Sequence, residues 1–124
     1  MSWSLQTKEG KLLPPLKFST GKTQEDIVQE IIQAMNEGHK VIFLHGQCGS
    51  GKSAIALNLA KELGRASIVV PVKYLQKQYE EDYTNKLTVM RNDKPLSIAI
   101  LTGRGNHPCL YNPASTAEDR LLPC

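Results

Sequence analysis

The stretch Gly46-Gln47-Cys48-Gly49-Ser50-Gly51-Lys52-Ser53 is the most informative part of this chain. It fits the pattern G-x-x-x-x-G-K-[ST], in which a glycine-rich loop wraps around phosphate groups. Glycine permits backbone angles and close approaches that a side chain blocks, so successive N–H groups can point at phosphate oxygens. Lys52 supplies a positive charge for the β- and γ-phosphates, and the Ser53 hydroxyl is placed to bind Mg²⁺. All eight residues are therefore candidate nucleotide contacts.

The residues on either side of this loop fit a strand and a helix. Val41-Ile42-Phe43-Leu44-His45 is an almost continuous apolar run, typical of a strand buried on both faces of a parallel sheet. Apolar residues between Ala54 and Leu63 predict a helix that Gly64 ends in a left-handed cap. Such a helix adds its dipole and its free N–H groups to an anion site. A glycine-rich turn with an unrelated lysine, the alternative, explains neither flank.

The composition is that of one small, ordinary globular domain. The chain has 124 residues, of which 40% are hydrophobic and 22% charged, and its net charge is +3. This charge is compatible with a nucleic-acid partner without indicating one. No apolar run approaches the roughly 18 residues of a membrane span, and residues 1–11 lack the apolar core of a signal peptide. We therefore expect no membrane partner and an intracellular location, cytoplasmic in a prokaryote or nuclear in a eukaryote, with cysteines as thiols or metal ligands.

Helices alternate with short apolar runs along the rest of the chain. Thr23 and Asp26 predict a capping box at the start of an amphipathic helix that ends near Gly38. Beyond the loop and its helix, an apolar run, a helical segment and a second apolar run follow at residues 67–70, 73–82 and 97–101. This alternation predicts an α/β fold with a mainly parallel sheet and right-handed crossovers.

Motifs in the same order resemble those of a known family. Gln24 lies upstream of the phosphate loop, and Leu75 and Gln78 fit the spacing x-x-L-x-x-Q after the second apolar run. Gly103-Arg104-Gly105-Asn106-His107-Pro108-Cys109 follows the third run. Together these residues resemble superfamily 2 helicases, specifically the iron–sulfur branch that includes XPD and DinG, over roughly residues 18–124. By this resemblance Gln24 contacts the adenine edge, and a capping or solvated glutamine is the alternative.

The resemblance also implies DNA, as a single strand and a fork, as the partner. The family normally carries threonine on either side of the proline in its motif Ia, whereas this chain has Val70 and Val72. The missing hydroxyl removes a phosphate hydrogen bond at position 72. The remaining candidates for nucleic-acid contacts are Lys73, Gln78 and Arg104.

Two cysteines are candidate metal ligands by the same resemblance. Cys109 matches the first and Cys124 the second thiolate ligand of a [4Fe–4S] cluster, which normally takes four thiolates. Cys48 lies in the phosphate loop and is not expected to serve a cluster. The spacing between Cys109 and Cys124 is not one of the tight ferredoxin patterns, so two ordinary loop thiols are the alternative.

The alternating elements together with this resemblance imply an α/β, partial RecA-like P-loop domain, truncated at the start of an iron–sulfur insertion. We expect a lead-in at residues 1–20, the first part of the ATP-binding domain at 21–103, and the beginning of a cluster domain at 104–124. The resemblance implies an ATP-dependent DNA helicase that uses ATP and Mg²⁺ and acts in DNA repair. The chain contains no D-E-A-H-like acidic run, so we expect it to be inactive alone. A small P-loop kinase or other NTPase, and a non-catalytic metal or redox module, are the alternatives.

Overall fold

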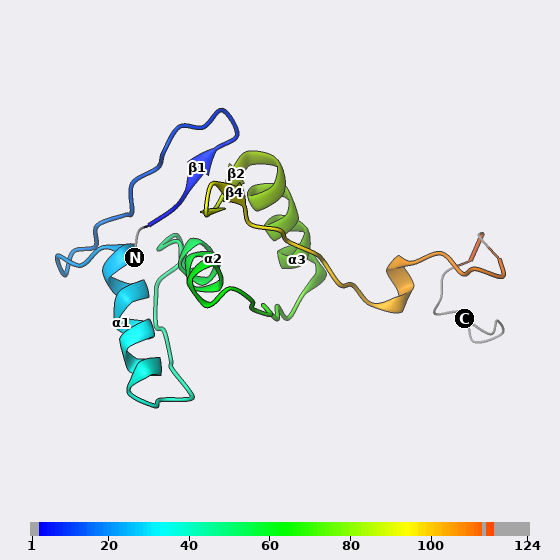
Figure 1. Ribbon diagram of the computed structural model, residues 1–124. Helices are drawn as coiled ribbons and strands as arrows, with labels where there is room; N and C mark the ends of the chain where they lie inside the picture. Colours follow the sequence, from blue (N-terminus) through cyan, green and yellow to red (C-terminus); the bar gives the residue numbers. More distant parts are fainter. Residues whose placement is uncertain (1–2, 113, 116–124) are drawn as a thin grey trace.

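Helices form the body of the molecule in the computed structural model, which describes residues 3–112, 114 and 115. In chain order they are α1 (Gln24–Asn36), α2 (Lys52–Leu63), α3 (Lys73–Glu80), the π-helix η1 (Glu81–Lys86) and the short 3₁₀ helix η2 (Arg104–Asn106). The strands are β1 (Gln6–Thr7), β2 (Leu87–Thr88), β3 (Met90–Arg91) and β4 (Lys94–Pro95). α1 lies beside α2, and the segment that carries η2 projects away from the helices (Figure 1).

The start of α1 confirms the predicted capping box. The Thr23 hydroxyl accepts a hydrogen bond from the Asp26 N–H at 3.2 Å, and the Asp26 carboxylate accepts one from the Thr23 N–H at 2.8 Å. The bond from the Thr23 backbone, followed by that from its side chain, lowers the pKa of Asp26 below its ordinary value. The cap therefore satisfies two N–H groups that the first helical turn leaves without a partner.

α2 supplies most of the core, and it ends as predicted. Its apolar face is buried, and Gly64 follows it with φ of 84° in the left-handed region, where glycine carries no steric cost. The buried apolar residues of the described chain are Val28, Ala54, Ile55, Leu57, Ala60, Val89 and Cys109. α2 is therefore the element around which α1 and the residues after η1 are packed.

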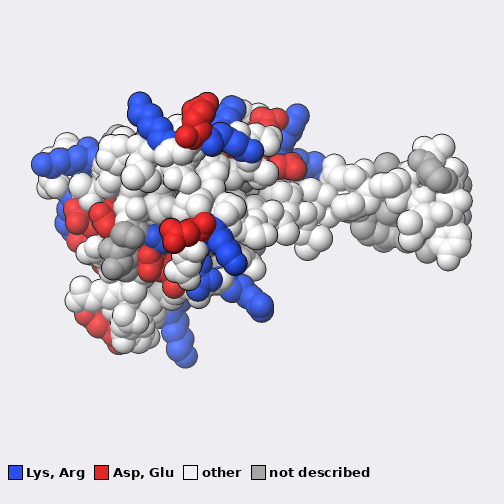
Figure 2. Space-filling view, turned by 45° about the horizontal axis from the view of Figure 1, so that its top comes forward, with Lys and Arg blue, Asp and Glu red and all other residues white. Residues whose placement is uncertain are grey.

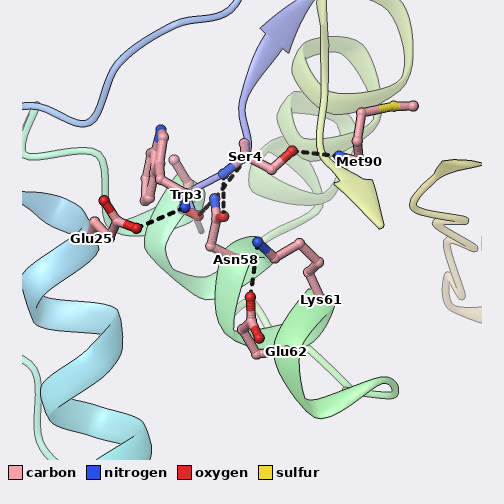
Figure 3. A network of polar contacts seen from close by, with 8 residues as sticks. Trp3, Ser4, Glu25, Asn58, Lys61, Glu62 and Met90 are labelled. Atoms are coloured by element: carbon pink, nitrogen blue, oxygen red, sulfur yellow. Dashed lines mark hydrogen bonds and ion pairs between the residues drawn. The ribbon is translucent and has the colours of Figure 1, made fainter. Parts of the chain in front are cut away.

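The buried amide of Asn58 holds the N-terminal segment against α2 (Figure 3). Its Oδ1 accepts a hydrogen bond from the Ser4 N–H at 2.9 Å, and its Nδ2 donates to the Ser4 carbonyl at 3.0 Å. Ser4 Oγ accepts from the Met90 N–H at 2.9 Å, and the Trp3 N–H donates to Glu25 at 3.0 Å. The N-terminal segment, which we expected to be a lead-in, therefore packs against the helices. Its strand β1 pairs antiparallel with β2.

The predicted mainly parallel sheet is not present among the described residues. Strand pairing there consists of two antiparallel ladders, β1 with β2 and β3 with β4. The apolar runs at 41–45, 67–70 and 97–101 form no strand, and Phe43 and Val69 are 94% and 92% exposed. An apolar run becomes a buried strand only when neighbouring backbone supplies partners for its N–H and C=O groups. In the part of the chain that the structure describes, none of these runs is paired with another strand.

Strands β3 and β4 form a hairpin whose turn lies at residues 92–93. Asn92 and Asp93 have φ of 50° and 60°, and they join β3 to β4 with Met90 opposite Pro95. Two positive φ angles in succession define the turn that matches the twist of a two-residue hairpin, and asparagine and aspartate tolerate that region. The pair Asn92-Asp93 was therefore a signal for this hairpin that our sequence analysis missed.

Two of the extended apolar runs line a cavity of about 520 Å³. Residues 64–70 and 96–101 contribute to its wall, with Leu57 and Ala60 from α2 and Tyr79 from α3. The side chains from α2 and α3 form the wall of the cavity opposite these two runs. The runs are thus gathered at one place in the fold without being joined by strand hydrogen bonds.

Candidate functional site

The loop at 46–53 turns sharply before α2. Gly49 and Gly51 have φ of 80° and 72°, a region that side chains rarely adopt. The Ser50 N–H donates to the Gln47 carbonyl at 3.2 Å, and Ser50 Oγ donates to the same carbonyl at 2.7 Å. A Cβ atom built on Gly51 would also force the Gln24 amide to shift, so glycine at this position leaves room for that side chain. The loop thus has the compact geometry expected from its sequence.

Lys52 lies across the loop at the start of α2. Its exposed ammonium donates to the carbonyls of Gly46 and Gln47, both at 2.8 Å. Gly51 precedes the helix without a side-chain cap, so the first turn of α2 keeps N–H groups for another acceptor. An ammonium, a helix N-terminus and a glycine loop at one place are the donor set that phosphate requires. The residues present therefore fit a nucleotide phosphate group.

The Gln24 amide is buried and bonded to the backbone on both sides. The residue is 3% exposed, and its Oε1 accepts a hydrogen bond from the Leu16 N–H at 2.9 Å. Its Nε2 donates to the carbonyls of Ser50 and Gly51 at 3.2 and 3.3 Å. The side chain thus links residue 16 to the phosphate loop. The contact of Gln24 with an adenine edge stays a prediction. To make that contact, the Gln24 amide would have to give up these backbone hydrogen bonds and form new ones with the base.

Replacement of Gln24 by alanine is expected to weaken nucleotide binding through the loop. The variant leaves the Leu16 N–H and two loop carbonyls without partners, at about 1 kcal/mol of stability per lost bond, so the loop is held less firmly in its bound shape. ATP and GTP should lose affinity equally, as measured by fluorescence titration. Gln29→Ala, an exposed glutamine on the same helix, is the matched control. A loss confined to ATP would instead identify Gln24 as the residue that contacts adenine.

A second cavity, of about 260 Å³, opens beside the loop. It is lined by Gly49, Gly51, Lys52, Ser53, Leu75, Gln78, Tyr79, Asp82 and Tyr83. The rings of Tyr79 and Tyr83 lie 5.7 Å apart between centroids and are tilted by 39°. Burial, followed by the charges of Tyr79 and Asp82, raises the pKa of Tyr83 to about 12. Asp82 and Tyr83 were not predicted from the sequence as neighbours of the loop.

The candidate nucleic-acid contacts lie on two elements. Lys73 and Gln78 belong to α3 and are exposed, and Arg104 begins η2. Gln76 Nε2 donates to the Leu101 carbonyl at 3.4 Å, so the chain leading to η2 passes beside α3. On the face in Figure 2, basic and acidic side chains are interspersed over the body of the molecule. Charge alone therefore does not outline a path for a nucleic acid on this face.

The cysteines are in three different situations. Cys48 is an exposed free thiol in the phosphate loop. Cys109 is 1% exposed and disulfide-bonded, and its N–H donates to the Ser115 carbonyl at 2.9 Å. Cys124 lies outside the described residues. Within those residues no group of three or more histidine, cysteine, aspartate or glutamate side chains is arranged to hold a metal ion. The predicted cluster is therefore not confirmed.

The chain matches a protein-family model over most of its length. The family model described as the type III restriction enzyme res subunit matches residues 17–119, a range that includes the phosphate loop, α1, α2 and α3. No curated protein and no solved structure matches significantly. None of the helices in the described part is long and apolar enough to cross a membrane.

Proposed function

This chain belongs to the type III restriction enzyme res subunit family, and from that membership we propose that it is the ATP-binding part of a DNA helicase. The family is helicase-like, with a RecA-like domain of superfamily 2, and its chemistry implies ATP, Mg²⁺ and nucleic acid. The observation that carries the proposal is the loop at 46–53. It leads directly into the N-terminus of α2, which has no side-chain cap, and the Lys52 ammonium donates a hydrogen bond to the loop carbonyl of Gly46.

The roles of the loop residues follow from phosphoryl-transfer chemistry. Lys52 would exchange its two carbonyl partners for the β- and γ-phosphates, and the loop N–H groups would bind the same oxygens. Ser53 would hold Mg²⁺, which supplies positive charge at the phosphates. Catalysis of this reaction rests on positioning and on electrostatic stabilisation of developing charge. The chain offers the phosphate-binding half of such a site, so we propose that hydrolysis occurs only in the full-length protein.

We also propose the finer assignment to the XPD and DinG type, acting in DNA repair within the cell. In this view residues 21–103 begin the RecA-like domain and residues 104–124 begin a cluster domain. The motif from Gly103 to Cys109 supports it, with Cys109 and Cys124 as cluster ligands and Lys73, Gln78 and Arg104 as DNA contacts. Iron binds thiolates, so the disulfide at Cys109 must be reduced before a cluster assembles.

Strand separation by the full-length protein tests the function. We expect ATP, but not a non-hydrolysable analogue, to drive the separation of a forked DNA duplex, and single-stranded DNA to stimulate hydrolysis. An RNA duplex of the same sequence is the matched substrate control. ATP hydrolysis at a rate that DNA does not change would contradict the helicase assignment and favour another class of P-loop enzyme.

The cluster assignment predicts a specific loss in Cys109→Ser. In the full-length protein this variant should lose most of its iron and its visible absorbance, because three thiolates hold a [4Fe–4S] cluster less securely than four. Strand separation should fall more than DNA-independent hydrolysis. Cys48→Ser, which changes the exposed thiol of the phosphate loop, should keep its iron. Equal iron in wild type and Cys109→Ser would remove Cys109 from the ligand set.

A further inference from the structure

One face of the helical segment formed by α3 and η1 lines the cavity beside the phosphate loop. The residues of this face recur at intervals of three and four along the chain, the spacing that places side chains in one stripe of a helix. We call them the helical wall, and they are Leu75, Gln78, Tyr79, Asp82 and Tyr83. The rest of the lining comes from the loop and the start of α2. The cavity therefore joins the phosphate loop to a surface of different chemistry.

The helical wall does not have the chemistry of a phosphate site. Phosphate groups are bound by lysine, arginine and backbone N–H groups, and none of the five side chains of this wall is cationic. Its one charged group, the Asp82 carboxylate, repels phosphate, although it faces Lys86 Nζ at 3.5 Å. Burial raises the pKa of Tyr83 to about 12, so its phenol is neutral. The wall is thus suited to an uncharged part of a ligand.

The helical wall offers what a nucleoside requires. The rings of Tyr79 and Tyr83 lie 5.7 Å apart between centroids, and both residues are half-buried. Tyrosine rings are platforms on which any base can stack. The Asp82 carboxylate accepts hydrogen bonds, which amino groups of bases and ribose hydroxyls donate. The cavity, at about 260 Å³, lies just below the roughly 300–1,000 Å³ of pockets that enclose whole drug-sized ligands. That size suits a nucleoside whose phosphates lie on the loop.

The amide of Gln24, by contrast, is already committed to the backbone. The residue is 3% exposed, its Oε1 accepts from the Leu16 N–H, and its Nε2 donates to the carbonyls of Ser50 and Gly51. A base bound by Gln24 would have to replace these bonds. A base in the cavity leaves them intact. The helical wall is therefore the better placed of the two to receive a base.

We propose that the helical wall binds the nucleoside part of the nucleotide, with the base against the rings of Tyr79 and Tyr83 while the loop holds the phosphates. This inference rests on the proposed function and adds a place for the base to it. It assigns to α3 and η1 the part of the affinity that a nucleotide has beyond its phosphate chain.

The test compares ATP with inorganic tripolyphosphate, which carries the phosphates without a nucleoside. Affinities for both ligands are measured by isothermal titration calorimetry on the full-length protein with Mg²⁺. We expect the wild type to bind ATP more tightly than tripolyphosphate. Tyr83→Ala should lose about 5- to 150-fold in ATP affinity, the range for removal of a stacking ring, and keep its tripolyphosphate affinity.

Three further variants of the same protein sharpen the comparison. Tyr83→Phe keeps the ring and should bind ATP nearly as the wild type does. Tyr83→Leu keeps apolar volume without an aromatic face, so it should share the selective loss even if Tyr83→Ala fails to fold. Tyr74→Ala is the matched control, because Tyr74 belongs to α3, is 74% exposed and does not line the cavity. It should change neither affinity.

Several results would overturn the inference. Equal wild-type affinity for ATP and tripolyphosphate would leave the loop as a phosphate site and remove the nucleoside from the helical wall. An equal loss of both ligands in Tyr83→Leu would show that the ring only supports the loop. Unchanged ATP affinity with weaker binding of single-stranded DNA, followed by fluorescence anisotropy, would assign the ring to nucleic acid instead. A wild type that binds neither ATP nor tripolyphosphate would overturn the proposed function itself.

Discussion

Lys52→Ala is expected to abolish ATP hydrolysis by the full-length protein while leaving its fold intact. The Lys52 ammonium is exposed and donates hydrogen bonds to two loop carbonyls. Water can bond to these carbonyls once the side chain is shortened to alanine. In a nucleotide complex the same ammonium would neutralise charge on the β- and γ-phosphates, where electrostatic stabilisation is the main source of catalysis. The loss in hydrolysis should therefore be far larger than any loss in stability.

Steady-state hydrolysis and thermal unfolding measured on the same samples check this expectation. Charge-assisted hydrogen bonds contribute about 1.5–3 kcal/mol, so nucleotide affinity should also fall by roughly 10- to 150-fold. Lys40→Ala, an exposed lysine before the loop, is the matched control and should retain activity. Wild-type turnover by Lys52→Ala would remove the phosphate-binding role from this loop.

Amide hydrogens in the apolar runs should exchange much faster than those of α2 in the isolated chain. The backbone of residues 41–44 and 68–70 has no strand partner in the described structure, and most of these side chains are exposed. The N–H groups of α2, by contrast, are bonded within a helix whose apolar face is buried. Protection of core amides approaches the global stability of a domain, about 5–15 kcal/mol, whereas solvent-exposed amides have almost none.

Hydrogen exchange followed by mass spectrometry on residues 1–124 measures this difference, with α2 as the internal standard. We expect the exposed apolar runs also to promote aggregation, since unpaired extended backbone is a template for another chain. Protection of residues 41–44 and 68–70 equal to that of α2, in a monomer, would contradict the expectation. It would mean that the runs are paired in a sheet in solution.

Local signals predicted the positions of the helices and of the glycine turn before α2 well. The capping box of Thr23 and Asp26 and the left-handed cap at Gly64 are confirmed, because each depends on residues within one helical turn. The α3 segment begins at Lys73 as expected, although its continuation as a π-helix was not foreseen. The signal at Asn92-Asp93 was present in the sequence and was overlooked.

The sequence by itself determined where α1 and α2 begin and end, and where a glycine turn precedes a helix, because short-range backbone geometry dictates these features. The tertiary structure alone decided which distant groups meet. Gln24 reaches Leu16 and the loop, Asn58 holds Ser4, and Asp82 and Tyr83 line a cavity together with Ser53. The tertiary structure also decided that the apolar runs do not form strands. Apolar periodicity describes a residue's preference for burial, but strand formation depends on backbone partners elsewhere in the chain. Such partners are a property of packing, which no local pattern encodes.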